Sequence, residues 1–190
     1  MHDIELDPMG STVAVTDLLG AMVAFLQPKI VVECGTYKGR TATVMAGSMV
    51  STGFPSFHIF TAETCPEYAD DARKLAEDNM MGEFVTVYTG DASDMLAEIV
   101  PPVIDLAYID GGDRFTLTRT IYDRLSEGGI IVLDDANQYT FTGRLKPTLM
   151  FRQGRGLAIF QRQFGNGNDI DFYNHRAFNL DYRKRIRGLE

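Results

Sequence analysis

The sequence predicts an α/β fold: a Rossmann-like, doubly wound and mostly parallel sheet of about seven strands, the last antiparallel, with helices on both faces. Three observations lead to this prediction. Short apolar runs alternate with segments of helical spacing along most of the chain. The run 103–110 is almost continuously apolar, as expected of a central strand buried on both faces. A glycine-bearing turn follows the first apolar run, at residues 30–34.

Local patterns place the individual elements. Apolar residues at helical spacing predict a first helix over 12–26, which Gln27-Pro28 ends. Further helices are expected at 39–49, 66–80, 95–100 and 117–125, and strands at 30–34, 58–63, 84–88, 103–110 and 130–133. Segments 148–152 and 156–163, joined by Gln153-Gly154-Arg155, have the pattern of a hairpin that adds the antiparallel strand.

Length and composition bound the class of protein. A chain of 190 residues predicts a single domain over 1–190, with an N-terminal arm at 1–11 and a C-terminal tail at 165–190. The net charge of −8 argues against nucleic acid as the partner, and without an 18-residue apolar run we expect no membrane span. Only two cysteines and no signal-peptide pattern predict a cytoplasmic protein.

The turn after the first strand is the strongest local motif. It reads Glu33-x-Gly35-x-x-x-Gly39, which differs from the Gly-x-Gly-x-x-Gly of dinucleotide-binding folds. Gly35 permits a sharp turn, and Gly39 permits close approach to the following helix. An acid at this position favours a cationic or neutral ligand over a diphosphate.

Acidic residues stand at the ends of five predicted strands. They are Glu33, Glu63, Asp91, Asp110 and the pair Asp134 and Asp135. Any one of them could be a helix cap, but right-handed crossovers bring the carboxyl ends of parallel strands to one edge of the sheet. The sequence therefore predicts an acidic rim suited to hydroxyl groups, amino groups or a positive centre.

These motifs, in this order, resemble those of class I S-adenosylmethionine-dependent methyltransferases. The chain is most similar to the small catechol- and caffeoyl-CoA-type O-methyltransferases and their bacterial relatives, over residues 12–163. The matching segments are Val31–Gly39, Phe60–Glu63, Gly90–Ala92, Ile104–Gly111 and Glu127–Asp135. The resemblance implies methyl transfer by in-line displacement, to an oxygen of a small-molecule acceptor.

The resemblance also implies a set of cofactor-binding residues. The first turn would lie along the methionine moiety, and Glu63 would bind the ribose hydroxyls. Asp91, at the end of the third predicted strand, would contact the adenine amino group. The implied cofactor-binding residues are Glu33, Gly35, Thr36, Tyr37, Gly39, Glu63, Asp91, Ala92 and Asp110.

The acceptor side is less well matched. Metal-dependent relatives use an Asp after strand four and an Asp-Asn pair after strand five. Asp110 and Asp135 fit, but Ala136 replaces the Asn, with Asn137 one residue later. We therefore do not favour a divalent metal such as Mg²⁺, although Asp110, Asp135 and Asn137 would be its ligands. Asp110 and Asp135 remain the candidate catalytic residues, while Arg114 cannot act as a base.

Two other classes of function stay open from the sequence. One is an NAD-dependent oxidoreductase on a related sheet, which the missing Gly-x-Gly-x-x-Gly motif disfavours. The other is a non-catalytic cofactor-binding or interaction protein. This class stays open because Ala136 replaces the expected Asn and no residue matches a catalytic base. The acceptor pocket is expected from residues 1–12, 112–116 and 136–145. A homodimer through the first helix or the hairpin edge is a further expectation.

Overall fold

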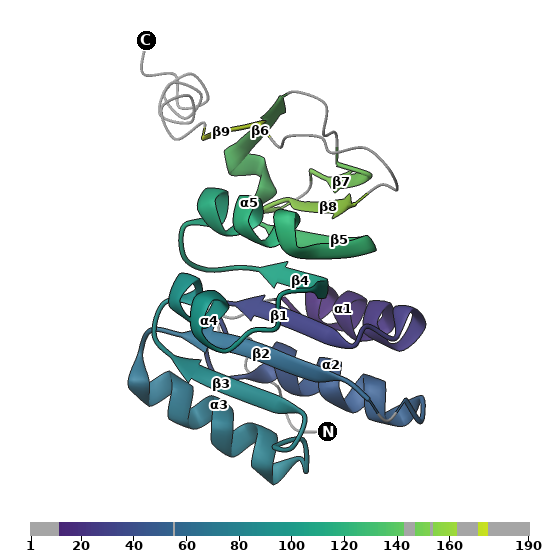
Figure 1. Cartoon of the computed structure of the whole chain (residues 1–190), viewed down its shortest axis with the longest axis vertical. Helices are drawn as coiled ribbons and strands as arrows, with labels where there is room; N and C mark the ends of the chain where they lie inside the picture. Colours follow the sequence, from purple (N-terminus) through teal and green to yellow (C-terminus); the bar gives the residue numbers. More distant parts are fainter. Residues whose placement is uncertain (1–11, 55, 143–146, 153, 163–170, 175–190) are drawn as a thin grey trace.

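The computed structural model describes residues 12–54, 56–142, 147–152, 154–162 and 171–174. Its main sheet has seven strands in the order β3-β2-β1-β4-β5-β8-β7 (Figure 1). Their bounds are β1 Ile30–Cys34, β2 His58–Glu63, β3 Val85–Thr89, β4 Ile104–Ile109, β5 Leu125–Asp134, β7 Leu149–Phe151 and β8 Leu157–Gln161. Strands β1 to β5 pair in parallel, and β8 runs antiparallel to both of its neighbours. The predicted fold class is confirmed.

Five helices accompany the parallel strands. They are α1 Val13–Leu26, α2 Arg40–Ser51, α3 Pro66–Asp78, α4 Ala92–Glu98 and α5 Arg114–Arg124. Helix α1 precedes β1, and the other four connect successive strands. Thr12 caps α1 by accepting a hydrogen bond from the Val15 N–H, and Pro66 occupies the first turn of α3, where its missing N–H costs nothing. Among the described residues, no helix combines the length and the apolar character that a membrane crossing requires.

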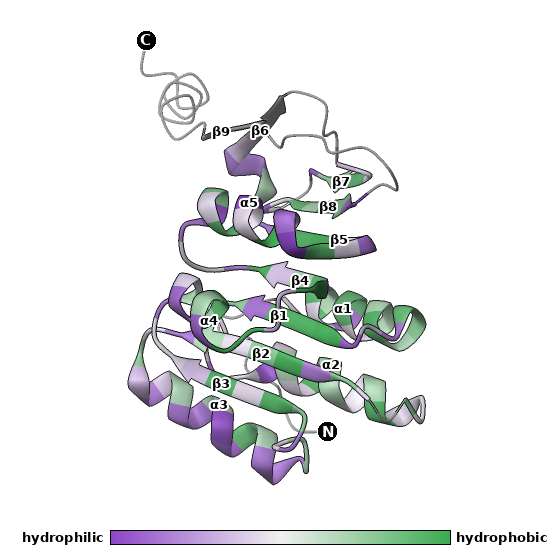
Figure 2. Cartoon of the chain, in the orientation of Figure 1, coloured by the Kyte–Doolittle hydropathy of each residue, from purple (hydrophilic) through white to green (hydrophobic). Residues whose placement is uncertain are grey.

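The helices cover both faces of the sheet. Alternate side chains of each central strand point to opposite faces, so Val31 packs with α1 and α2 while Val32 packs with α4 and α5. In β4, Leu106 likewise packs on the side of α1 and α2, and Ala107 packs on the side of α4 and α5. Figure 2 shows the hydrophobic residues gathered along the central strands and hydrophilic ones along much of α3. The sheet is therefore buried on both sides, as its near-continuous apolar strands predict.

Three elements begin three or more residues before the predicted position, namely α4, β5 and α5. Helix α5 begins at Arg114 rather than residue 117, because Asp113 caps it by accepting the N–H groups of Phe115 and Thr116. Helix α4 begins at Ala92 rather than residue 95, because Asp91 caps it by accepting the Ser93 N–H. Strand β5 begins at Leu125 rather than residue 130. Its pairing with β4 shifts register between Ile104 and Leu106, so the glycines of Glu127-Gly128-Gly129 lie at an irregularity within the strand and do not form a separate turn.

The C-terminal segment contains a strand that the sequence pattern did not reveal. Strand β9, Asp171–Asn174, pairs antiparallel with β6, Tyr139–Thr142, which follows the short 3₁₀ turn η1, Ala136–Gln138. Residues 171–174 of the predicted C-terminal tail, 165–190, form this strand, and the rest of the predicted tail lies outside the described residues. The predicted arm at 1–11 lies outside the described residues.

The turn after β1 contacts the turn after β4. Gly35 has a φ of +96°, and a Cβ added there would lie 2.9 Å from the Gly111 backbone nitrogen. Gly39 has a φ of +81°, and its Cβ would lie 2.7 Å from the Cα of Ala72 in α3. Both positions therefore require glycine. The order of strands reverses between β1 and β4, the point at which open α/β sheets bind their ligands.

Candidate functional site

The predicted acidic residues lie at one edge of the sheet. Glu33 and Glu63 are in the last residues of β1 and β2, and Asp110 directly follows β4. Asp91 lies two residues beyond Thr89, the last residue of β3, while Asp134 ends β5 and Asp135 follows it. The parallel pairing of these five strands gives them a common direction, so the carboxylates form the rim that the sequence predicts.

Glu33 is a buried carboxyl group with one free oxygen. It is 1% exposed, and its Oε2 accepts hydrogen bonds from the hydroxyls of Thr36 at 2.9 Å and Thr61 at 2.5 Å. Its Oε1 is buried with no hydrogen-bond partner among the described residues. Burial raises the pKa of Glu33 to about 7, Asp110 and Glu63 add to the rise, and the two hydroxyls oppose it. A cationic ligand at this turn would supply the charge partner that Glu33 lacks.

Glu63 is held in place by backbone groups. Its Oε2 accepts the Tyr37 N–H at 2.8 Å, and its Oε1 accepts the Cys65 N–H at 2.9 Å. Tyr37 itself has a φ of 50°, which is uncommon for a non-glycine residue, and its ring packs edge-on against Tyr68 at 4.7 Å. The first turn and the end of β2 are therefore locked together, and each carboxylate oxygen keeps lone-pair capacity for a further donor.

Asp91 has a structural role of its own. Its Oδ1 accepts the Ser93 N–H at 2.7 Å and so caps α4, whose first residue, Ala92, is buried. Asp91 is exposed, so its carboxylate faces solvent at the end of β3. The helix-cap interpretation thus accounts for one oxygen of this residue, and ligand binding would have to use the other.

Arginine side chains bind the acids at the ends of β4 and β5. The Arg114 Nη2 donates to the Asp110 carbonyl oxygen at 2.8 Å, to Asp110 Oδ1 at 3.2 Å and to Asp135 Oδ2 at 3.0 Å. Arg155, from the turn between β7 and β8, lies 2.8 Å from Asp134 Oδ2 through Nη2 and 3.4 Å from Asp135 Oδ1 through Nε. Partial burial lowers the pKa of Arg155, but the neighbouring carboxylates, above all Asp134, raise it by more. The pKa therefore rises overall, and Arg155 stays charged.

Asn137 does not join these acids. Its side-chain amide donates to the carbonyl oxygens of Arg152 at 2.9 Å and Gly154 at 3.2 Å, and so holds the turn between β7 and β8. Among the described residues, no group of three or more His, Cys, Asp or Glu side chains is placed to hold a metal ion. The set Asp110, Asp135 and Asn137 therefore does not fit a divalent cation in this arrangement.

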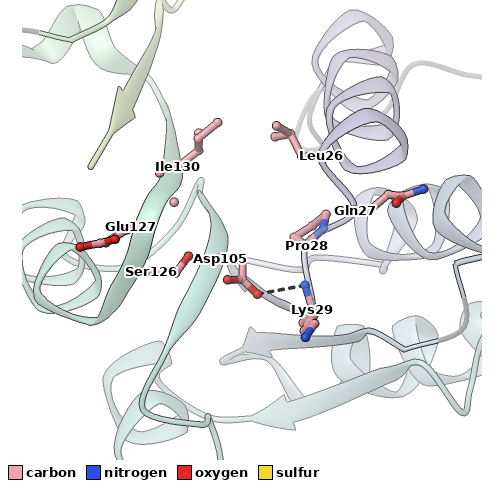
Figure 3. A pocket seen from close by; sticks show the side chains of 10 residues that line it. Leu26, Gln27, Pro28, Lys29, Asp105, Ser126, Glu127 and Ile130 are labelled. Carbon is pink, nitrogen blue, oxygen red and sulfur yellow. Dashed lines mark hydrogen bonds between the residues drawn. The ribbon is translucent and has the colours of Figure 1, made fainter. Parts of the chain in front are cut away.

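A pocket lies at the opposite edge of the sheet. Figure 3 shows it between the end of α1, the start of β4 and the start of β5. Asp105 in this pocket accepts the backbone N–H groups of Lys29 at 2.9 Å and Ile30 at 3.0 Å. Because these residues are at the amino ends of their strands, this pocket is separate from the acidic rim, and Asp105 has a structural role in it.

The comparisons with known proteins agree with this fold and motif order. Residues 32–136 match the family described as "Methyltransferase domain", which is more than half of the chain. The chain belongs to this family. The class that its motifs predict, a class I methyltransferase of the S-adenosylmethionine-dependent type, is confirmed.

Solved structures with the same fold include two O-methyltransferases. TomG of Streptomyces achromogenes, in complex with SAM, has a TM-score of 0.66 and 15% identity, over 83% of both chains. The Bacillus cereus enzyme, in complex with SAH, has a TM-score of 0.65 and 17% identity, over 82% of both chains.

One curated relative is closer in sequence but matches over a shorter stretch. A protein-L-isoaspartate O-methyltransferase of Staphylothermus marinus is 34% identical over 97 residues, which is 48% of this chain. That match spans 43% of the relative, so the chain aligns with less than half of its length.

Three residues of the rim were not predicted from the sequence to bind its acids. Arg114 follows Asp110 by four residues, but Asp110 precedes α5, so the spacing rule for helical side chains did not predict this pair. Thr61 and Arg155 contact their acids across 28 and 21 residues. No local spacing could have identified either contact.

Proposed function

We propose that this protein transfers the methyl group of S-adenosylmethionine to an oxygen atom of a small-molecule acceptor. The acceptor oxygen attacks the methyl carbon, the carbon–sulfur bond breaks with its electron pair going to sulfur, and the acceptor proton passes to solvent water. The products are the methylated acceptor and S-adenosylhomocysteine, whose sulfur is uncharged. Catalysis of such a displacement rests mainly on holding the two reactants in line at about 3 Å.

The observation that carries this proposal is the buried, half-satisfied carboxyl group of Glu33 beside the glycine turn. Its unpartnered Oε1 and the neighbouring carboxyl group of Glu63 make a negative environment that favours the sulfonium cation over the neutral product. Glu63, fixed by two backbone N–H groups, supports the role of ribose acceptor. Gly35, Thr36, Tyr37 and Gly39 would line the methionine moiety, and Asp91 and Ala92 the adenine.

The chain gives little support to the competing classes. Its family is one of methyltransferase domains, and the first turn lacks the dinucleotide motif, so an NAD-dependent oxidoreductase is not favoured. The acidic composition supports an acceptor other than nucleic acid. A homodimer remains a prediction, with exposed Leu149 and Phe151 on the edge strand β7 as its candidate surface.

A product assay tests the proposed reaction. Purified protein is incubated with S-adenosylmethionine and a panel of phenols, catechols and carboxylic acids, together with an L-isoaspartyl peptide, because one relative is named for that acceptor. We expect acceptor-dependent formation of S-adenosylhomocysteine. Base-labile methyl groups would identify carboxyl acceptors, whereas base-stable ones would identify hydroxyl acceptors. Methyl groups found only on nitrogen or carbon would contradict the proposal.

A further inference from the structure

The carboxylates at the ends of β4 and β5 are already paired with fixed positive charges. Both oxygens of Asp135 lie beside a guanidinium group, Oδ2 beside Arg114 at 3.0 Å and Oδ1 beside Arg155 at 3.4 Å. Asp110 shares the same Arg114 nitrogen at 3.2 Å. Arg114, Asp110 and Asp135 have side chains that are only 16%, 12% and 14% exposed, so solvent screens this network weakly.

A divalent cation does not fit among these groups. Mg²⁺ requires close oxygen ligands in near-octahedral geometry, and Arg114 stands between the two carboxylates that would have to supply them. The nearest amide oxygen in sequence, that of Asn137, belongs to a side chain engaged with the β7–β8 turn. Displacing Arg114 would also break the ion pairs of a largely desolvated guanidinium, which is costly.

Arg114 has hydrogen-bonding capacity beyond these acids. All the hydrogen bonds described above come from its Nη2, and its buried Nε has no partner among the described residues. A guanidinium carries five donors in a fixed plane. The group is therefore both a charge partner for Asp110 and Asp135 and a preorganised donor at the end of β4.

We propose that Arg114, held between Asp110 and Asp135, supplies the positive charge at the acceptor side of the site and that the protein works without a divalent metal. This inference rests on the proposed methyl transfer. A fixed, preorganised positive charge stabilises negative charge that develops on a reacting oxygen. Arg155 lies 3.4 Å from the second oxygen of Asp135 and adds to the positive charge that a cation would meet there.

Titration with Mn²⁺, followed by electron paramagnetic resonance, tests metal exclusion without any acceptor. We expect the wild type to bind Mn²⁺ with a Kd no tighter than roughly 1 mM, the weak end of carboxylate cation sites. Arg114→Gln removes the charge and should tighten binding at least about tenfold, since two carboxylates lose their cation. Arg114→Lys keeps the charge and should behave as the wild type. Arg119→Gln, an exposed change on the same helix, should have no effect.

Two results would overturn the inference. One is micromolar Mn²⁺ binding by the wild type that Asp135→Asn abolishes. The other is a folded Arg114→Gln protein that binds Mn²⁺ no better than the wild type. Should Arg114→Gln fail to fold, the wild-type titration and the persistence of methyl transfer in EDTA decide the question. S-adenosylmethionine binding, measured on the same samples, separates this inference from the proposed function. A wild-type protein that does not bind S-adenosylmethionine would refute the proposed function, whereas the Mn²⁺ titration tests the exclusion of metal.

Discussion

Replacing Glu63 by Gln is expected to weaken S-adenosylmethionine binding at least about tenfold, or about 1.4 kcal/mol. The carboxylate is partly buried against the first turn and accepts the N–H groups of Tyr37 and Cys65. A ribose diol would donate to the remaining lone pairs, and hydrogen bonds to an ionised acceptor are about twice as strong as neutral ones. Gln removes the charge and turns one acceptor atom into a donor that faces a backbone N–H.

Calorimetry with the wild type, Glu63→Gln and a control measures this effect. Glu77→Gln removes an exposed acid from α3 and should leave the dissociation constant unchanged. Thermal unfolding of each protein without ligand shows whether the variant is folded at the temperature of the titration. An unchanged affinity for a folded Glu63→Gln protein would remove Glu63 from the cofactor site.

Replacing Glu33 by Gln is expected to change how stability depends on pH. Burial raises the pKa of Glu33 from 4.5 to about 7, so between these values the folded protein keeps a proton that the unfolded chain has lost. Stability from this group is therefore lost as the pH rises through that window. At about 1.4 kcal/mol per pKa unit, the loss amounts to roughly 3 kcal/mol between pH 4.5 and 7. Gln has no proton to lose.

Denaturant unfolding of the two proteins at pH 5 and pH 8 isolates this group, because every other carboxyl group is common to both. We expect the stability of Glu33→Gln relative to the wild type to increase by about 2.5 kcal/mol from pH 5 to pH 8, since part of the change falls below pH 5. A difference that stays constant with pH would show that Glu33 is ionised throughout the range. The same variant should also bind S-adenosylmethionine more weakly at pH 8, where the wild type carries the charge.

The parallel core of the fold could be predicted because its signals are local. Strand β2 has the predicted bounds, since apolar residues lead directly to an acid at 58–63. The start of β5 could not be predicted, because Gly128 and Gly129 are typical of a turn and only pairing with β4 places them in a strand. Pairing of β6 with β9 joins segments about 30 residues apart, and neither has a strong apolar pattern.

The candidate site was predictable to a similar extent. Acids at strand ends are visible in the sequence, because parallel strands bring their carboxyl ends together. What neutralises those acids is not visible, because Arg155 reaches Asp134 only through the hairpin that packs β8 on β5. Whether Asp110, Asp135 and Asn137 could bind a divalent cation therefore depended on tertiary contacts. The sequence left the metal site open because Ala136 replaces the expected Asn and Asn137 follows one residue later. The structure adds that Arg114 lies between Asp110 and Asp135.

The most direct measurement is calorimetric titration of the wild-type protein with S-adenosylmethionine and, separately, with NAD, each with and without Mg²⁺. We expect saturable, micromolar binding of S-adenosylmethionine that Mg²⁺ does not change, and no binding of NAD. Absence of S-adenosylmethionine binding under both conditions, or saturable binding of NAD in its place, would contradict the assignment of this site to methyl transfer.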